Sequence, residues 1–308
     1  MQPRSVKSGL LPLLVTAFVW GWPNILIKLV SQDFDALTQS FFRYLAASTT
    51  TAVLCLIFWR RAYRDGWRNL RHLLLPATVV TIHQMSYVTG VYLTSAIAAS
   101  VISKTSALFV PALSFLFFPE ERAIIRNPRF LAGTALALAG VMGLVLARGG
   151  MMMGAHPAGP VLLILSAFLW SLFSVLIKPV TGRVDPLVIT GIVPLLSCLL
   201  FFPLWASLAH LGQVFTAPPR SVLIMLGSGI LVVGIGNTLY YIAIQRVGTA
   251  ISTNFLLSTP LVAGVLAYVI LGERLTPLQM VFSAVLLTGC LLISRSAMPK
   301  KAQILRAR

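Results

Sequence analysis

AFVWGWPNILIK at residues 17–28 and AFLWSLFSVLIK at residues 167–178 repeat one pattern at an offset of 150 residues. In each copy a tryptophan, a small polar residue and a lysine are spaced four apart, so in a helix they share one face. These faces consist of Trp20, Asn24 and Lys28, and of Trp170, Ser174 and Lys178. A helix repeated with the same face indicates a chain made of two related halves.

Two further matches follow in the same order. Residues 87–99, YVTGVYLTSAIAA, align with residues 240–252, YYIAIQRVGTAIS, with tyrosine and small residues recurring. A Glu-Arg pair at residues 121–122 recurs at residues 273–274. Apolar helices of low complexity can match by chance, but three matches in one order favour a duplication.

The composition predicts an all-α integral membrane protein. Of 308 residues, 57% are hydrophobic and only 10% are charged, a balance that a soluble domain does not sustain. A helix needs about 20 apolar residues to cross a hydrocarbon core about 30 Å thick. We predict ten such spans, five in an N-terminal repeat (residues 1–150) and five in a C-terminal repeat (residues 151–308). The spans are 9–30, 37–59, 72–93, 96–118, 129–148, 160–180, 186–208, 221–245, 248–271 and 277–296.

Five is an odd number, so the two repeats are expected to cross the membrane in opposite directions, as an inverted repeat. The basic residues are concentrated in alternate connections and in the C-terminal tail. They are Arg60, Arg61, Arg64, Arg68 and Arg71, then Arg122, Arg126 and Arg129, then Arg295, Lys300, Lys301, Arg306 and Arg308. The positive-inside rule makes these segments cytoplasmic, with both termini inside.

The net charge of +17 does not indicate a nucleic-acid partner, because the basic residues are divided among short connections between apolar runs. The cysteines Cys55, Cys198 and Cys290 each lie within an apolar run and have no CxxC spacing. We interpret them as packing residues and expect no metal and no cofactor. The expected partners are membrane lipid and a small zwitterionic or amphipathic metabolite, bound by a monomer.

Three motifs resemble those of the drug/metabolite transporter superfamily, specifically its ten-helix EamA-type exporters. WGWPNILIK at 20–28 is similar to the family's first-helix pattern, ALTQSFFRYLAA at 36–47 to its second-helix Arg-aromatic signature, and LGERLT at 271–276 to its Gly-Glu-Arg turn. The first half departs from that turn at residues 118–122, FPEER, where proline replaces the glycine. Among the exporters, the YddG-like exporters of aromatic amino acids are the most similar. The resemblance implies efflux through a central cavity lined by helices one, three, four, six, eight and nine.

Aromatic and neutral polar residues on these helices are the candidates for substrate binding. Tryptophan can stack on a substrate and donate one hydrogen bond, although it is also common at membrane interfaces. His83 could bind a substrate carboxylate or titrate, or it could join two helices by a hydrogen bond. The candidates are Trp20, Asn24, His83, Gln84, Tyr87, Lys104, Trp170, Ser174, Asn237, Tyr240, Asn254 and Ser258.

Lys104, which is one of these candidates, and two further residues lie within spans where their chemistry is unusual. Lys104 could attract an anionic group of the substrate, or its long side chain could extend so that the ammonium reaches the membrane surface. For Arg43, which belongs to the second-helix signature, we favour a structural role. Pro23 removes a backbone hydrogen bond and frees the carbonyl of Val19, so we expect a loosened first helix that acts as a gate or sets a static kink.

All acidic residues lie in connections or at span ends, namely Asp33, Asp35, Asp65, Glu120, Glu121, Asp185 and Glu273. Ion-coupled carriers usually have a carboxylate within the membrane, so we predict uncoupled transport of aromatic or neutral amino acids by alternating access. The alternatives are a channel or structural membrane protein, or a proton-coupled exporter of nucleosides, drugs or other amphipathic metabolites. No motif for a nucleophile, metal or acid pair is present within a span, so an enzyme is not expected.

Overall fold

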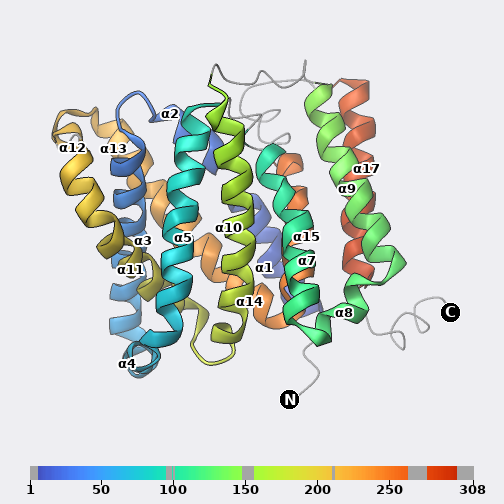
Figure 1. The fold of residues 1–308 in the computed structure, drawn as a ribbon, viewed down its shortest axis with the longest axis horizontal. Helices are drawn as coiled ribbons and strands as arrows, with labels where there is room; N and C mark the ends of the chain where they lie inside the picture. Colours follow the sequence, from blue (N-terminus) through green and yellow to red (C-terminus); the bar gives the residue numbers. More distant parts are fainter. Residues whose placement is uncertain are drawn as a thin grey trace.

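The computed structural model describes residues 6–94, 99, 101–147, 156–209, 212–262 and 276–296. Every element assigned within these residues is helical, and the long helices run side by side (Figure 1). Six described helices are long and apolar enough to cross a membrane, namely Gly9–Leu29, Ala36–Phe58, Ala158–Thr181, Pro186–Leu208, Pro219–Val247 and Pro277–Ser296. Two shorter apolar helices, Ser103–Phe117 and Pro128–Leu144, accompany them.

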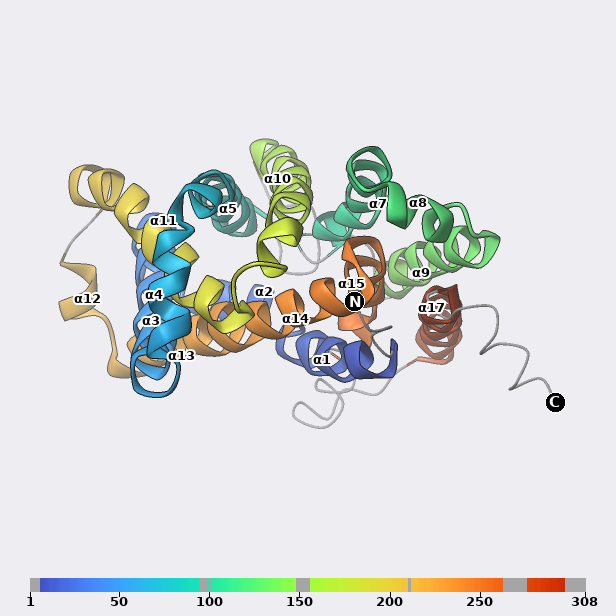
Figure 2. The same ribbon diagram turned by 90° about the horizontal axis from the view of Figure 1, so that it is seen from below.

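The helices pack as antiparallel pairs, each joining a helix from residues 1–150 to one from residues 151–308. The pairs are α1 (Val6–Val19) with α14 (Asn237–Val247), α3 (Ala36–Phe58) with α11 (Pro186–Leu208), α5 (Leu70–Tyr92) with α10 (Ala158–Thr181), α7 (Ser106–Phe117) with α15 (Thr249–Phe255), and α9 (Pro128–Leu146) with α17 (Pro277–Ser296). The pair α3–α11 lies at one end of the molecule and α9–α17 at the other (Figure 2).

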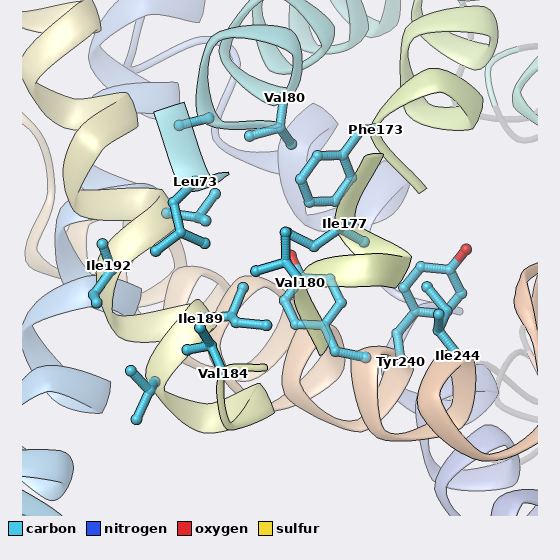
Figure 3. Close-up of a cluster of buried hydrophobic side chains, with 14 of the residues drawn as sticks. Leu73, Val80, Phe173, Ile177, Val180, Val184, Ile189, Ile192, Tyr240 and Ile244 are labelled. Carbon is cyan, nitrogen blue, oxygen red and sulfur yellow. The ribbon is translucent and has the colours of Figure 1, made fainter. Parts of the chain in front are cut away.

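The largest hydrophobic core lies where α5, α10, α11 and α14 meet. Leu73, Phe173, Ile189 and Tyr240 come from these four helices, are fully buried and converge on one another (Figure 3). Large apolar side chains also cover the outside of the bundle, as at Leu199 on α11. Apolar residues on both the inside and the outside are what a bundle in lipid requires, because its outer surface contacts hydrocarbon.

Two aspartates explain where α3 and α11 begin. Asp35 accepts a hydrogen bond from the backbone N–H of Thr38 at 2.7 Å, and Asp185 accepts one from Leu187 at 2.9 Å. Each carboxylate satisfies a backbone donor that has no partner within its helix. These acids therefore lie at helix ends, as the sequence predicted for the acidic residues.

The first and eighth predicted spans are not uniform helices. The break expected from Pro23 is present, because α1 ends at Val19 and α2 (Pro23–Leu29) begins at the proline. Between α13 (Pro219–Ser228) and α14 lies a π-helix, η2 (Gly229–Gly236), which the sequence did not predict. Residues 263–271 of the ninth span lie outside the described residues.

Three short helices occupy connections between the long ones. They are α4 (Arg60–Arg68), α8 (Pro119–Ile125) and α12 (Gln213–Thr216). All four arginines of α4 are exposed, and its Tyr63 and Gly66 are buried against α11. It lies on the same side of the bundle as α8 (Figure 1).

Helices α9 and α17 meet at glycines. A Cβ atom on Gly289 would lie 2.5 Å from the backbone nitrogen of Ala137, and one on Gly140 would lie 2.7 Å from that of Leu286. Because both obstacles are backbone atoms, neither can rotate away. The two helices can approach this closely only without side chains at these positions.

We therefore expect Gly289→Leu to separate α9 from α17 and to lower the unfolding free energy in detergent by about 1–3 kcal/mol, as overpacking does. Gly227→Leu is the matched control, because Gly227 is exposed and nothing lies within 4 Å of its would-be Cβ. Denaturant titration of both variants measures the difference. Equal stability of the two would contradict the close packing.

Candidate functional site

A cavity of about 150 Å³ lies between the two sets of helices. It is lined from the N-terminal part of the chain by α2, α3, α5, α7 and η1 (Ser103–Thr105), and from the C-terminal part by α10, η2, α14, α15 and η3 (Leu256–Ser258). An engineered protein cavity of about 150 Å³ can hold benzene. In this conformation the cavity therefore has room for a group the size of one aromatic ring.

Aromatic rings form one wall of this cavity. The ring centroids of Trp20 and Trp170 are 5.3 Å apart in an edge-to-face arrangement, and those of His83 and Trp170 are 5.2 Å apart. Tyr87 stacks on His83 at 5.7 Å. Tyr240 lies behind both tryptophans, with centroids 5.0 and 5.5 Å from theirs. These spacings suit aromatic pairs, so the wall is a rigid surface against which a planar solute can stack.

Hydrogen bonds fix the orientation of this wall. The Trp20 indole donates to the carbonyl of Val232 at 3.2 Å, and Val232 lies in η2. A Cβ atom on Gly236 would collide with the Trp20 indole nitrogen, so glycine is needed for this approach. The hydroxyl of Tyr87 donates to Asn24 Oδ1 at 2.7 Å. His83 Nδ1 lies 2.9 Å from the carbonyl of Ser166, which can only accept, so Nδ1 carries a hydrogen.

An arginine, a glutamine and a lysine that line the cavity have side-chain nitrogens with few or no hydrogen-bond acceptors. Arg43 is 2% exposed, yet its Nε and Nη1 have no acceptor among the described residues. The amide nitrogen of Gln84 also has no acceptor among the described residues. The Nζ atom of Lys104 donates a long hydrogen bond, 3.5 Å, to the carbonyl of Leu256. No acidic side chain is found among the described residues that line the cavity.

Nine of the residues predicted from the sequence for binding or gating line this cavity. They are Trp20, Pro23, Asn24, His83, Gln84, Tyr87, Lys104, Trp170 and Asn237. Their contact with a solute stays a prediction.

Four other predicted residues do not line the cavity, namely Ser174, Tyr240, Asn254 and Ser258. Ser174 donates to the carbonyl of Trp170 and lies 3.1 Å from the Tyr240 hydroxyl, within the core. Asn254 donates to Thr134 on α9, and the Ser258 hydroxyl has no partner among the described residues.

Arg43, for which we favoured a structural role, lines the cavity. So do Tyr44, Ser103, Ser106 and Thr253, which the sequence did not single out. One signal was available: an ionisable residue well inside a span is more often functional than structural.

Lys28 and Lys178, which match in the repeated pattern, each form hydrogen bonds that connect neighbouring helices. Lys28 donates to the carbonyl of Tyr92, the last residue of α5, at 3.1 Å and to that of Thr94, just beyond it, at 3.0 Å. Lys178, at the same position of the repeated pattern, donates to Glu120 at 2.9 Å and Glu121 at 2.7 Å. Its ammonium also lies 3.7 Å from the ring centroid of Phe118.

Glu121 is the centre of the second of these clusters. Its carboxylate, 5% exposed, accepts the backbone N–H groups of Thr249 and Ala250 at 2.8 and 3.0 Å. It therefore joins the start of α15 to α8 and to the end of α10. Gly248 makes the turn into α15 with a φ of 89°, and its would-be Cβ lies 2.8 Å from Glu121. Only glycine fits both constraints.

Glu120 belongs to the same cluster but lies at the surface. The hydrogen bond from Lys178 holds the pKa of Glu120 below its ordinary value. A carboxylate of this kind contributes stability above its unfolded pKa, and that contribution is lost as the pH falls through its folded pKa. Because the Glu120 side chain is 64% exposed, solvent screening keeps this contribution small.

Comparisons with known proteins agree on the type of protein. The model of the EamA-like transporter family matches residues 7–146 and again 157–295. An "Uncharacterized transporter" of Archaeoglobus fulgidus is 28% identical over 274 residues, covering 87% of this chain and 90% of its own length. A "Probable terminal-alkyne amino-acid exporter" of Streptantibioticus cattleyicolor is 24% identical over 292 residues, covering 94% and 95%.

The fold also has a solved counterpart. A structure described only as "Crystal structure of protein" matches with a TM-score of 0.76 and 18% identity, over 95% of this chain and 98% of that one.

We expect Glu121→Gln to lower the unfolding free energy by about 1–3 kcal/mol, because the buried carboxylate loses the charge that strengthens its hydrogen bonds with Lys178, Thr249 and Ala250, while Lys178 keeps Glu120 as a partner. Glu120→Gln keeps the same geometry at an exposed position and should cost less than about 1 kcal/mol. Denaturant titration in detergent compares the two. A larger loss for Glu120→Gln would show that the buried carboxylate does not hold the cluster together.

Proposed function

Because this chain belongs to the EamA-like transporter family, we propose that it exports aromatic and neutral amino acids by facilitated transport through the cavity. It is a multi-pass membrane protein, and in a prokaryotic cell its place would be the inner membrane. Ten spans with both termini in the cytoplasm remain our expectation for its topology, and a monomer for its oligomeric state.

The aromatic wall is the observation that carries the choice of substrate. Trp20, Trp170, Tyr87 and His83 present flat apolar surfaces to a space of about ring size. Pockets for small molecules combine such surfaces with a few polar groups that fix orientation. The name of the Streptantibioticus relative, an amino-acid exporter, points to the same class of solute.

The helix pairing supports alternating access. In each of the five pairs named above, the helices are antiparallel and come from different repeats, as expected if the repeats are inverted and rock against each other around a central site. The break before Pro23 and the π-helix η2 place irregular backbone at the cavity. Such interruptions are where helices bend most readily, which is why we keep Pro23 as the gating residue.

The charges of the cavity support uncoupled transport. Carriers driven by protons or sodium usually exchange charge on a carboxylate within the membrane. The described residues that line this cavity include Arg43 and Lys104 but no acid. The direction of net transport would then follow the solute gradient, which favours efflux when the cell holds the higher concentration.

Counterflow of labelled phenylalanine into proteoliposomes tests this substrate, with neutral amino acids, a nucleoside and a sugar phosphate as competitors. We expect Trp170→Ala to raise the KM for phenylalanine about tenfold, through lost stacking and lost apolar contact. Trp59→Ala is the control, because Trp59 is 50% exposed at the end of α3. If the nucleoside or sugar phosphate competes and amino acids do not, the substrate class is wrong. Ohmic conductance without saturation would instead indicate a channel.

The same vesicles test coupling. We expect imposed proton and sodium gradients to leave the initial rate of phenylalanine counterflow unchanged within about twofold, since no cavity acid takes up a cation. Valinomycin with potassium sets the membrane voltage to zero as a control. Accumulation of phenylalanine against its gradient, driven by either ion, would refute uncoupled transport.

A further inference from the structure

We propose that Arg43, supported by Gln84 and Lys104, is the carboxylate-binding pole of the cavity and makes a carboxylate the group by which substrates are recognised. This inference rests on the proposed function and specifies how its substrates are selected. The sequence favoured a structural role for Arg43, so the assignment comes from where the structure places its guanidinium.

The argument begins with unused hydrogen-bond donors. Arg43 Nε, Arg43 Nη1 and Gln84 Nε2 are all buried and have no acceptor among the described residues. Buried donors are almost always paired, so a group of unpaired ones needs an explanation. All three belong to residues that line one cavity, and Lys104 lines it as well. The missing partner is therefore an acceptor, and an anionic one, that enters the cavity.

No acid of the protein fills this role among the described residues. Asp33 lies half-buried in the turn before α3, and Asp35 and Asp185 cap helices. Asp65 pairs with Arg68 at the surface, and Glu120 and Glu121 bind Lys178. None of these acids lines the cavity. A buried guanidinium in a membrane protein normally faces a counter-ion, a carbonyl or water. Here Arg43 belongs to the lining of the cavity that we propose as the substrate site.

Arg43 is also held in place, as a receptor group should be. The backbone of α3 at Arg43 lies against Gly229, so closely that any Cβ there would collide with the Arg43 carbonyl. The next residue, Tyr44, packs edge-to-face on Phe201 with centroids 5.7 Å apart. The packing of α3 therefore fixes the backbone from which the Arg43 side chain extends, and the surroundings of that side chain leave the residue only 2% exposed. A donor held in position before binding loses little freedom when the anion arrives.

The chemistry selects a carboxylate over other anions. A guanidinium offers two parallel N–H groups that match the two oxygens of a carboxylate, and the amide of Gln84 adds a third donor. Acceptors for an ammonium are present too, because Ser103 and Ser106 donate their hydrogens to backbone carbonyls at 2.6 and 3.0 Å. Their oxygen lone pairs remain available in the cavity lining. A zwitterion thus finds both kinds of partner.

The residues of the proposed pole, Arg43, Gln84 and Lys104, all belong to the N-terminal repeat. At the offset of 150 residues that relates Lys28 to Lys178, the position of Arg43 is occupied by Val193, which is buried. At the offset of 153 residues that aligns residues 87–99 with 240–252, Gln84 corresponds to Asn237, a shorter neutral amide that also lines the cavity. The carboxylate would stay with the N-terminal repeat during transport, while Trp170 of the C-terminal repeat contacts the ring.

The test uses the purified full-length chain in proteoliposomes and labelled phenylalanine. Two competitors separate its charged groups: 3-phenylpropanoate keeps the carboxylate, and phenethylamine keeps the ammonium. For the wild type we expect 3-phenylpropanoate to inhibit at least about tenfold more strongly than phenethylamine. Phenyl phosphate is a third competitor and should be weaker than 3-phenylpropanoate.

In Arg43→Gln we expect the KM for phenylalanine to rise about tenfold or more and the preference for 3-phenylpropanoate to fall to within about threefold. Arg43→Lys keeps the positive charge but lacks the two parallel N–H groups of a guanidinium. Its KM and its preference for 3-phenylpropanoate should therefore lie between those of the wild type and of Arg43→Gln. Arg61→Gln is the matched control, because Arg61 is an exposed arginine on α4. It should leave both quantities unchanged.

An unaltered KM and preference in Arg43→Gln would overturn the proposal, and so would stronger inhibition by phenyl phosphate, which indicates a phosphate pole. If the Arg43 variants do not fold, the competitor preference of the wild type decides alone. If the wild type moves no amino acid, the proposed function fails. The carboxylate pole is then judged separately, by whether 3-phenylpropanoate and not phenethylamine raises the melting temperature of the wild type.

Discussion

The lack of water in the hydrocarbon core is the constraint on which this structure depends. Polar groups must find partners inside the protein, so the described elements are all helical, and hydroxyls such as those of Thr51 and Ser171 donate to carbonyls of the preceding turn. Against this background the cavity is an exception. It gathers a guanidinium and an amide with unpaired donors in one place, and that is the physical mark of a site for something that enters from outside.

Much of the fold could be predicted because hydrophobic length and helix caps are local properties. The predicted spans 37–59, 186–208 and 277–296 coincide with α3, α11 and α17 to within one residue at each end. The π-helix η2 could not be predicted, since its residues GILVVGIG look like any apolar run. Its residues contact Trp20 and α3, which are far away in the sequence, so the sequence of η2 alone does not contain its surroundings.

The candidate site was predictable only in part, for a geometric reason. Spacing of four identifies residues on one side of a helix, so Trp20 and Asn24 were found together, as were His83 and Tyr87. It does not say which neighbouring helix that side meets. Ser174 shares a face with Trp170, yet its hydroxyl turns back into the core toward Tyr240. For Arg43 the family signature is equally compatible with packing and with binding, and only its position in the cavity lining led us to propose binding.

The antiparallel pairing has an electrical consequence. Each helix has a dipole along its axis, with a partial positive charge at the N-terminus and a partial negative charge at the C-terminus. Where two helices lie side by side in opposite directions, these dipoles largely cancel. The paired helices therefore add little field along the membrane normal, and the potential inside the cavity is set by its side chains, above all Arg43 and Lys104. A zwitterion bound there has no net charge, so the membrane voltage would do little work on it during the crossing.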